Sequence, residues 1–228
     1  MSKIGFGYGS EWHLLRYLGY HRNLLNESVM GATGADSLEW LDSPFDSKAA
    51  FLDSEWKGLD FLSANSPARN ALGDFWPQSG NVPNWDAVGH ITFAGEQEWL
   101  LVEAKAHVGE LQSACKAKGN GGLPMIKAAL DETKRVMEID PETNWLTPYY
   151  QYANRMAWLR FLVNHGVSAR LLFVYFLGDT VPNKICPSTT EEWTQALKTM
   201  YRHLGLIGSS HLEQRVHRVF LPVCSDKS

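Results

Sequence analysis

The residues of this chain best suited to chemistry are an aspartate, a glutamate and a lysine: Asp86, Glu103 and Lys105. Glu103 follows Asp86 by 17 positions, and Lys105 stands two positions after Glu103. Two carboxylates that come close together repel each other unless a cation lies between them. Magnesium in proteins favours one or two carboxylates plus water, and a lysine beside such an ion can orient the attacking water. These residue types therefore indicate metal-assisted hydrolysis, provided that the fold brings them together.

The surrounding elements predict that the three side chains meet. Residues 86–93 mix small, β-branched and aromatic residues, residues 94–97 have the composition of a hairpin loop, and residues 99–102 form an apolar run typical of a fully buried strand. In an antiparallel pair the start of one strand lies beside the end of the next. Because side chains alternate along a strand, Glu103 and Lys105 point to one face. We therefore expect Asp86, Glu103 and Lys105 at the same end of the sheet.

This aspartate, followed after Leu-Leu-Val by Glu-Ala-Lys, resembles the signature of the PD-(D/E)xK nuclease superfamily, which includes many restriction enzymes and DNA-repair nucleases. The resemblance covers residues 84–107, with weaker support from the order of elements up to residue 177. The family pattern has proline directly before the aspartate, whereas Trp85 stands there in this chain. The alternative is a surface hairpin with a simple Glu103–Lys105 ion pair. The buried character of residues 99–102 favours the functional interpretation.

The resemblance implies a restriction-endonuclease-like α/β fold, in which a mixed β-sheet is flanked by α-helices. It also implies a divalent-metal-dependent nuclease that hydrolyses phosphodiester bonds, with DNA as the expected substrate and Mg²⁺ or Mn²⁺ as the cofactor. Asp86 and Glu103 would be metal ligands, the Ala104 backbone carbonyl a further oxygen ligand, and Lys105 would position the attacking water. His107 is expected to be a bystander.

Other candidate site residues lie before and after the hairpin. Many nucleases of this family carry a metal-binding glutamate on their first helix, and Glu11 begins a helix predicted over residues 11–26; a glutamate there equally complements the helix dipole. Gln151 and Arg155, on a helix predicted over residues 149–164, are candidates for supporting the ligands or contacting nucleic acid. The alternative is the polar flank of an amphipathic helix.

Two lysines complete the set of candidates. Lys116 and Lys118 lie in a glycine-rich segment, residues 108–123, that could contact a phosphate backbone. The alternative is a solvated loop.

The remaining pattern favours one nuclease-like α/β domain over residues 1–228. Residues 27–83 are irregular and are interpreted as a family-specific insertion, and their aromatic residues fit a core better than a base-stacking surface. Periodicity, caps and β-branched runs predict further elements. The expected helices cover residues 36–41, 47–62, 125–139 and 189–204, and the expected strands cover residues 170–177 and 215–223.

Composition limits the class of protein. The formal charge is −4, which counts against a general nucleic-acid binder, although a bound metal supplies local positive charge. Three widely spaced cysteines indicate free thiols in a reducing cytoplasm, and no apolar run is long enough to cross a bilayer. We therefore expect a cytoplasmic protein whose partner is nucleic acid and not a membrane. The sequence leaves the oligomeric state open, a homodimer included.

Two alternatives remain open at this stage. One is a nuclease-fold protein that binds nucleic acid or serves a structural role without turnover. The other is an unrelated acid–base hydrolase acting on carbohydrate, for which nine tryptophans would suit a sugar cleft. Metal dependence separates the nuclease from the carbohydrate hydrolase, because only the nuclease needs a divalent ion at Asp86 and Glu103.

Overall fold

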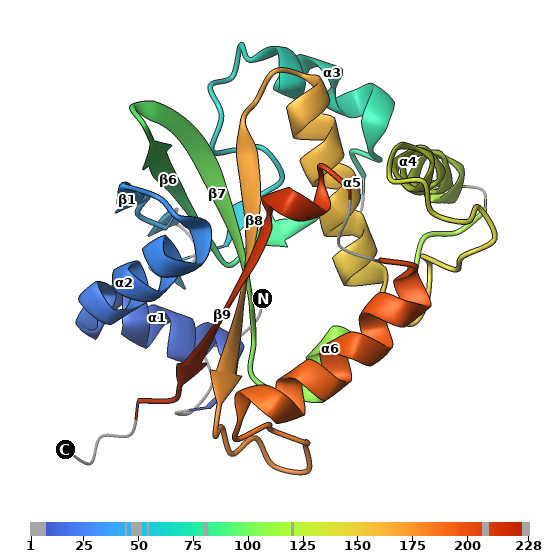
Figure 1. Cartoon of the computed structure of the whole chain (residues 1–228). Coiled ribbons are helices and arrows are strands. Elements are labelled where there is room, and N and C mark those ends of the chain that lie inside the picture. Colours follow the sequence, from blue (N-terminus) through green and yellow to red (C-terminus); the bar gives the residue numbers. More distant parts are fainter. Residues whose placement is uncertain are drawn as a thin grey trace.

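The centre of the molecule is a five-stranded mixed β-sheet (Figure 1). The computed structural model describes residues 8–43, 55–79, 82–119, 121–206 and 210–224, together with the backbone of residues 45–46 and 52–53. The first two strand pairs of the sheet are antiparallel and the last two are parallel. In sheet order the strands are β1 (Ser37–Trp40), β6 (Ala87–Phe93), β7 (Glu96–Lys105), β8 (Ala169–Leu177) and β9 (Val216–Pro222).

Helices cover both faces of this sheet, which confirms the predicted α/β class (Figure 1). One face carries α1 (Ser10–Tyr20) and α2 (Arg22–Thr33), and the other carries α5 (Tyr150–Asn164) and α6 (Thr190–Leu204). Two further helices, α3 (Pro67–Phe75) and α4 (Leu123–Val136), pack against α5. The short elements are β2 (Phe45–Asp46), β3 (Leu52–Asp53), β4 (Trp56–Lys57), β5 (Asn84–Trp85) and the 3₁₀ helices η1 (Val108–Leu111) and η2 (Glu213–Arg215).

The predicted hairpin is present as β6 and β7. Its pairs run from Ala87 opposite Val102 to Phe93 opposite Glu96. The connection is a two-residue turn of Ala94 and Gly95, both with positive φ (47° and 88°), as the twist of a tight hairpin favours. The predicted four-residue loop was therefore too long, because Glu96 and Gln97 belong to the strand.

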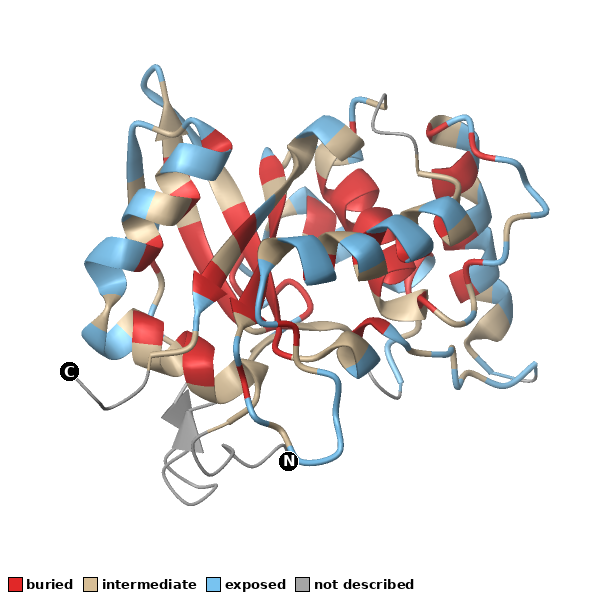
Figure 2. Cartoon of the chain, turned by 60° about the horizontal axis from the view of Figure 1, so that its bottom comes forward, coloured by how far each residue is buried: buried red, intermediate tan, exposed pale blue. Residues whose placement is uncertain are grey.

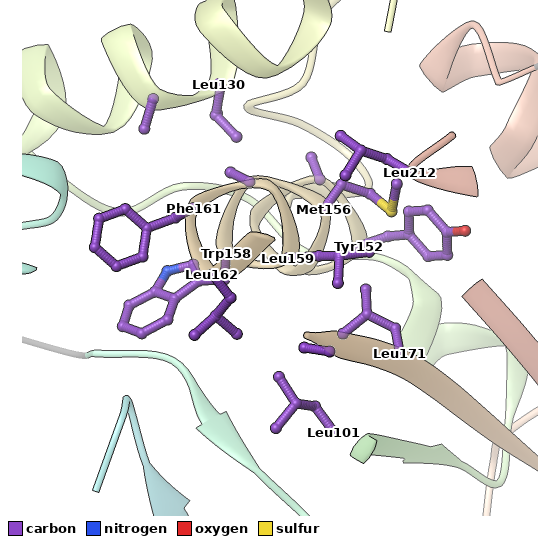
Figure 3. Packing of buried hydrophobic residues seen from close by; sticks show 14 of the residues in the cluster. Leu101, Leu130, Tyr152, Met156, Trp158, Leu159, Phe161, Leu162, Leu171 and Leu212 are labelled. Atoms are coloured by element: carbon purple, nitrogen blue, oxygen red, sulfur yellow. The ribbon is translucent and has the colours of Figure 1, made fainter. Parts of the chain in front are cut away.

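Helix α5 lies in the interior and not on the surface. Figure 3 shows Leu101 and Leu171 of the sheet on one side of this helix and Leu130 of α4 on the other. The burial colours of Figure 2 show the same enclosure. Because α5 is covered on both sides, its polar residues are buried as well, and buried charges need partners. The polar residues of α5, for which the alternative was a polar flank of an amphipathic helix, therefore form a hydrogen-bonded network in the interior.

Several predicted elements differ from the structure. The single helix expected over residues 11–26 is broken at His21, whose N–H donates back to Arg16 and Tyr17 and ends α1. Residues 37–40 form β1 and not a helix, because they pair with β6 far along the chain. Within the described part of residues 47–62 the chain forms β3, β4 and a turn instead of a helix.

Other predictions are confirmed. Helices α4, α5 and α6 and strands β8 and β9 lie within a few residues of their predicted bounds. The described aromatic side chains of residues 27–83 mostly fill the core: Trp40, Phe61, Phe75 and Trp76 are buried. The three cysteines are free thiols. Among the described residues, no helix has the length and apolar character needed to cross a membrane.

Candidate active site

Asp86 lies at a bend between β5 and β6, directly before the first residue of β6. Its N–H donates to the Val102 carbonyl (3.0 Å), and its Oδ2 accepts the N–H of Ala104 (2.6 Å). At the end of β7 the Asp86 carboxylate thus accepts a hydrogen bond that a backbone carbonyl of a neighbouring strand would otherwise accept. Because the N–H and C=O of one strand residue point to the same side, the Ala104 carbonyl lies on the Asp86 side too. The Asp86 carboxylate and the Ala104 carbonyl are therefore on the same edge of β7.

Glu103 is buried, and its carboxylate is fully engaged. Its Oε2 accepts two bonds from Arg155, from Nε (2.9 Å) and Nη2 (2.6 Å). Its Oε1 accepts one bond from Gln151 Nε2 (2.7 Å) and one from Lys105 Nζ. A carboxylate offers about four acceptor positions, so all of them are filled. The Glu103–Lys105 ion pair of the alternative interpretation exists, but in a larger buried network and not on a surface hairpin.

Arg155 is held from several directions. Its Nη2 donates to the Asn84 carbonyl (2.6 Å) and its Nη1 to Asn154 Oδ1 (3.0 Å), in addition to the two bonds to Glu103. The guanidinium also lies 4.7 Å from the ring centre of Trp85, a cation–π distance. The tryptophan that stands in place of the family's proline therefore supports Arg155.

The pKa values of the two carboxylates are shifted in opposite directions. Burial, with the nearby charge of Glu103, raises the pKa of Asp86 to about 8. Burial would also raise the pKa of Glu103, but Lys105 and Arg155 hold it below its ordinary value. Burial would lower the pKa of Lys105, but Glu103 and Asp86 raise it above its ordinary value. These shifts favour the charged forms of Glu103 and Lys105 and the protonated form of Asp86.

A cleft of about 980 Å³ opens beside Asp86. Its walls come from β4, β5, residues 113–117 and the first turns of α4 and α5. The acidic and basic residues that line it are Glu55, Lys57, Asp86, Lys116 and Arg155. Basic residues outnumber acidic ones in this cleft, whereas acidic residues outnumber basic ones in the chain as a whole.

A second, much smaller pocket lies beside Glu103. This pocket of about 10 Å³ is lined by Glu103 and Lys105. Neither residue lines the cleft, whereas Arg155 does and Gln151 lines both spaces. Gln151 and Arg155 therefore stand between the cleft and the Glu103–Lys105 pair.

The structure brings most of the predicted site residues together. Hydrogen bonds join Lys105, Gln151 and Arg155 to Glu103. Asp86 lies close enough to Glu103 and Lys105 to interact with them electrostatically. Of the two lysines predicted in the glycine-rich segment, Lys116 lines the cleft and Lys118 does not. His107 caps η1 and pairs with Glu110, in keeping with a bystander.

Glu11, the remaining candidate ligand, has Glu55 as an electrostatic neighbour. It occupies the first turn of α1, and burial together with the charge of Glu55 raises its pKa. Glu55 also contributes to the raised pKa of Asp86. Glu55 and Lys57, which flank Trp56, were missed by the sequence analysis. No local pattern marks them, since only the pairing of β4 with β5 brings them to the cleft.

The donors suit a hard divalent cation, but their present arrangement is closed. The carboxylates of Asp86 and Glu103 and the carbonyl of Ala104 are the oxygen donors that Mg²⁺ prefers. Within the described ranges, however, no group of three histidine, cysteine, aspartate or glutamate side chains is placed to hold a metal ion. The donor chemistry fits the ion, whereas the acceptor positions of Glu103 are taken by the protein.

Comparison with known proteins found no matching family model, curated protein or solved structure. The resemblance to the PD-(D/E)xK superfamily therefore depends on the motif and on the way its residues are arranged.

Proposed function

We propose that this protein is a divalent-metal-dependent nuclease of the PD-(D/E)xK type that hydrolyses phosphodiester bonds, with DNA as the expected substrate. The observation that carries the proposal is the convergence of Asp86, Glu103 and Lys105 at the end of the central hairpin, beside a large polar cleft. The antiparallel hairpin that continues into parallel strands supports a restriction-endonuclease-like form of the α/β fold.

In this proposal the two carboxylates and the Ala104 carbonyl hold Mg²⁺ or Mn²⁺. The bound ion would supply a water of lowered pKa and would stabilise negative charge on the phosphate. Lys105 is protonated, so its part is to orient the attacking water and not to remove its proton. Lys57 and Lys116 attract the phosphate backbone to the cleft. Their position reconciles nucleic-acid binding with the overall charge of −4.

A second candidate is a protein that binds nucleic acid in the same cleft without turnover. The observation that favours it is the complete use of the Glu103 acceptor positions by protein donors. The carbohydrate alternative has less support, because a sugar cleft needs exposed aromatic rings. Six of the tryptophans are buried and the other three, Trp12, Trp56 and Trp99, are partly buried.

A cleavage assay separates these candidates. Wild type, Asp86→Asn and the control Asp74→Asn, an exposed aspartate on α3, would be incubated with DNA and RNA, single- and double-stranded, in Mg²⁺, Mn²⁺ or EDTA. We expect cleavage in Mg²⁺ or Mn²⁺, none in EDTA, and a loss of about a hundredfold or more in Asp86→Asn alone. Binding without cleavage under every condition would favour the second candidate. Cleavage in EDTA would contradict the metal requirement.

A further inference from the structure

The closed arrangement around Glu103 makes a specific demand on any cation that binds there. Four donor bonds already reach its two oxygens. A carboxylate with four acceptor positions in use must lose a donor before it can coordinate a cation. One of its three donor residues, Lys105, Gln151 or Arg155, must therefore move.

The surroundings of the three donors identify the one that moves. Lys105 is buried, and it lines the small pocket and not the cleft. Gln151 shares Oε1 with Lys105, so its departure alone frees only part of one oxygen. Arg155 alone occupies Oε2, with two bonds. It lines the cleft together with its other partners, Asn84 and Asn154, whose bonds it must also give up when it turns outward. A guanidinium and a divalent cation also repel each other at close range.

We propose that Arg155 occupies the cation position at Glu103, and that Arg155 and a divalent metal ion exclude each other there. When Arg155 leaves Glu103, its planar guanidinium faces the cleft, where it can bind a phosphate of the nucleic acid with two parallel bonds. This inference rests on the proposed function and adds to it the way in which the site is opened.

The exchange couples the two ligands of the site. Nucleic acid in the cleft stabilises the outward position of Arg155 and so raises the affinity of Glu103 and Asp86 for metal. By thermodynamic reciprocity the metal then raises the affinity for nucleic acid by the same factor. The protein without nucleic acid is therefore a weak metal binder.

The exchange is tested by calorimetric titration of Mn²⁺ into protein without nucleic acid. The variants are Arg155→Gln and Arg155→Lys, with Arg160→Gln as a matched control. Arg160 is a second buried arginine of α5, and its Nε donates to Thr133 Oγ1 (3.0 Å). We expect Arg155→Gln to bind Mn²⁺ about tenfold or more tightly than wild type, since a charged hydrogen-bond partner no longer competes. Arg160→Gln should bind like wild type.

Thermal unfolding adds a second measurement. A purely structural role of Arg155 does not predict that Mn²⁺ stabilises the variant more than wild type. In EDTA, Arg155→Gln should melt below wild type, because Glu103 loses a buried partner. Mn²⁺ should then raise its melting temperature by more than it raises that of wild type. If Arg155→Gln does not fold, Arg155→Lys decides the question, because a single ammonium cannot replace the bidentate contact and should also bind Mn²⁺ more tightly than wild type.

The outcomes separate the exchange from the proposed nuclease function. If wild type cleaves nucleic acid but the Arg155 variants bind Mn²⁺ no better than wild type, the exchange is wrong and the function stands. If the Arg155 variants bind Mn²⁺ more tightly but wild type does not cleave nucleic acid, the exchange stands and the function falls. If neither wild type nor the variants bind Mn²⁺, both are overturned.

Discussion

At the scale of single residues, two neighbouring carboxylates differ because their partners differ. Glu103 has Lys105 and Arg155 as cationic partners and stays charged. For Asp86, burial and then the charge of Glu103 raise the pKa to about 8, against the lowering effects of Lys105 and the Ala104 N–H. A cation that binds both carboxylates therefore competes with the Asp86 proton, so its affinity should rise with pH.

The raised pKa of Asp86 predicts a pH-dependent effect of Asp86→Asn on stability. The folded-state pKa is about 8, against an ordinary value of 3.8. Between these values the folded protein binds more protons at this site than the unfolded chain, so its free energy of unfolding falls as pH rises. Asp86→Asn removes this loss and should be more stable than wild type at pH 9, with the difference shrinking toward pH 5.

Denaturant unfolding at pH 5, 7 and 9, without metal, measures this difference. Asp74→Asn, on the exposed surface of α3, serves as the control and should follow wild type at each pH. A stability difference between wild type and Asp86→Asn that stays constant across the three pH values would contradict a raised pKa.

At the scale of elements, local pattern was sufficient where the signal and the partner lie close together in sequence. The β6–β7 hairpin followed from its alternation and turn, and α6 from its cap, where Thr189 accepts the Glu192 N–H. The register of the β6–β7 hairpin also placed Asp86 near Glu103. Strand β1 was missed because its partner, β6, is about 50 residues away in the chain and tertiary pairing overrides local propensity.

The sequence could not predict how the Glu103 carboxylate of the candidate site is enclosed by protein donors. Gln151 and Arg155 were identified as candidates, but their contact with Glu103 depends on the rotation of α5 against the sheet. That rotation is set by packing on both sides of the helix, with α4 as the outer layer (Figure 3). Glu55 was missed for a similar reason, since it reaches the cleft beside the short β4–β5 pair.

The hairpin turn gives a stability prediction at this scale. Ala94 adopts a left-handed φ of 47°, a conformation that costs free energy for a residue with a Cβ and that asparagine tolerates better. Ala94→Asn should therefore stabilise the protein by about 0.5–1 kcal/mol. Urea unfolding measures the change, and Gly95→Ala should shift the midpoint in the opposite direction because φ there is 88°. A destabilised Ala94→Asn would show that this turn is not strained.

At the scale of the whole molecule, the relevant quantity is the distribution of charge and not its sum. The net charge is −4, yet the cleft is lined by Lys57, Lys116 and Arg155. With a Debye length of about 8 Å at physiological salt, a nucleic acid in the cleft experiences mainly these nearby cations. An acidic protein can therefore hold a phosphate backbone at one site.

This distribution predicts which lysines contribute to salt-dependent binding. Lys57→Ala and Lys116→Ala should each weaken DNA binding in EDTA and reduce the slope of log K against log salt by about 0.7–0.9, because fewer counterions are released. Lys118→Ala should have less effect, since Lys118 does not line the cleft. Lys127→Ala, an exposed residue of α4 outside the cleft, is the control. Equal slopes for all four variants would place the nucleic acid elsewhere.

The central claim is that Lys105 acts on the reaction, and the rate of a Lys105→Met variant tests it most directly. Methionine keeps much of the packing of the lysine stem but cannot orient water. Because Lys105 is buried against Glu103, this substitution should lower the melting temperature somewhat, while Arg155 and Gln151 still hold Glu103. Lys134→Met removes a comparable buried lysine, bonded to the carbonyls of Pro141 and Thr143, and serves as the control.

The measurement is the single-turnover cleavage rate in Mn²⁺ at a temperature where both variants are folded. We predict that, at saturating Mn²⁺, Lys105→Met loses about a hundredfold or more in rate and that Lys134→Met cleaves like wild type. A Lys105→Met variant that cleaves at nearly the wild-type rate would contradict the account, because Lys105 would then serve only to balance the charge of Glu103.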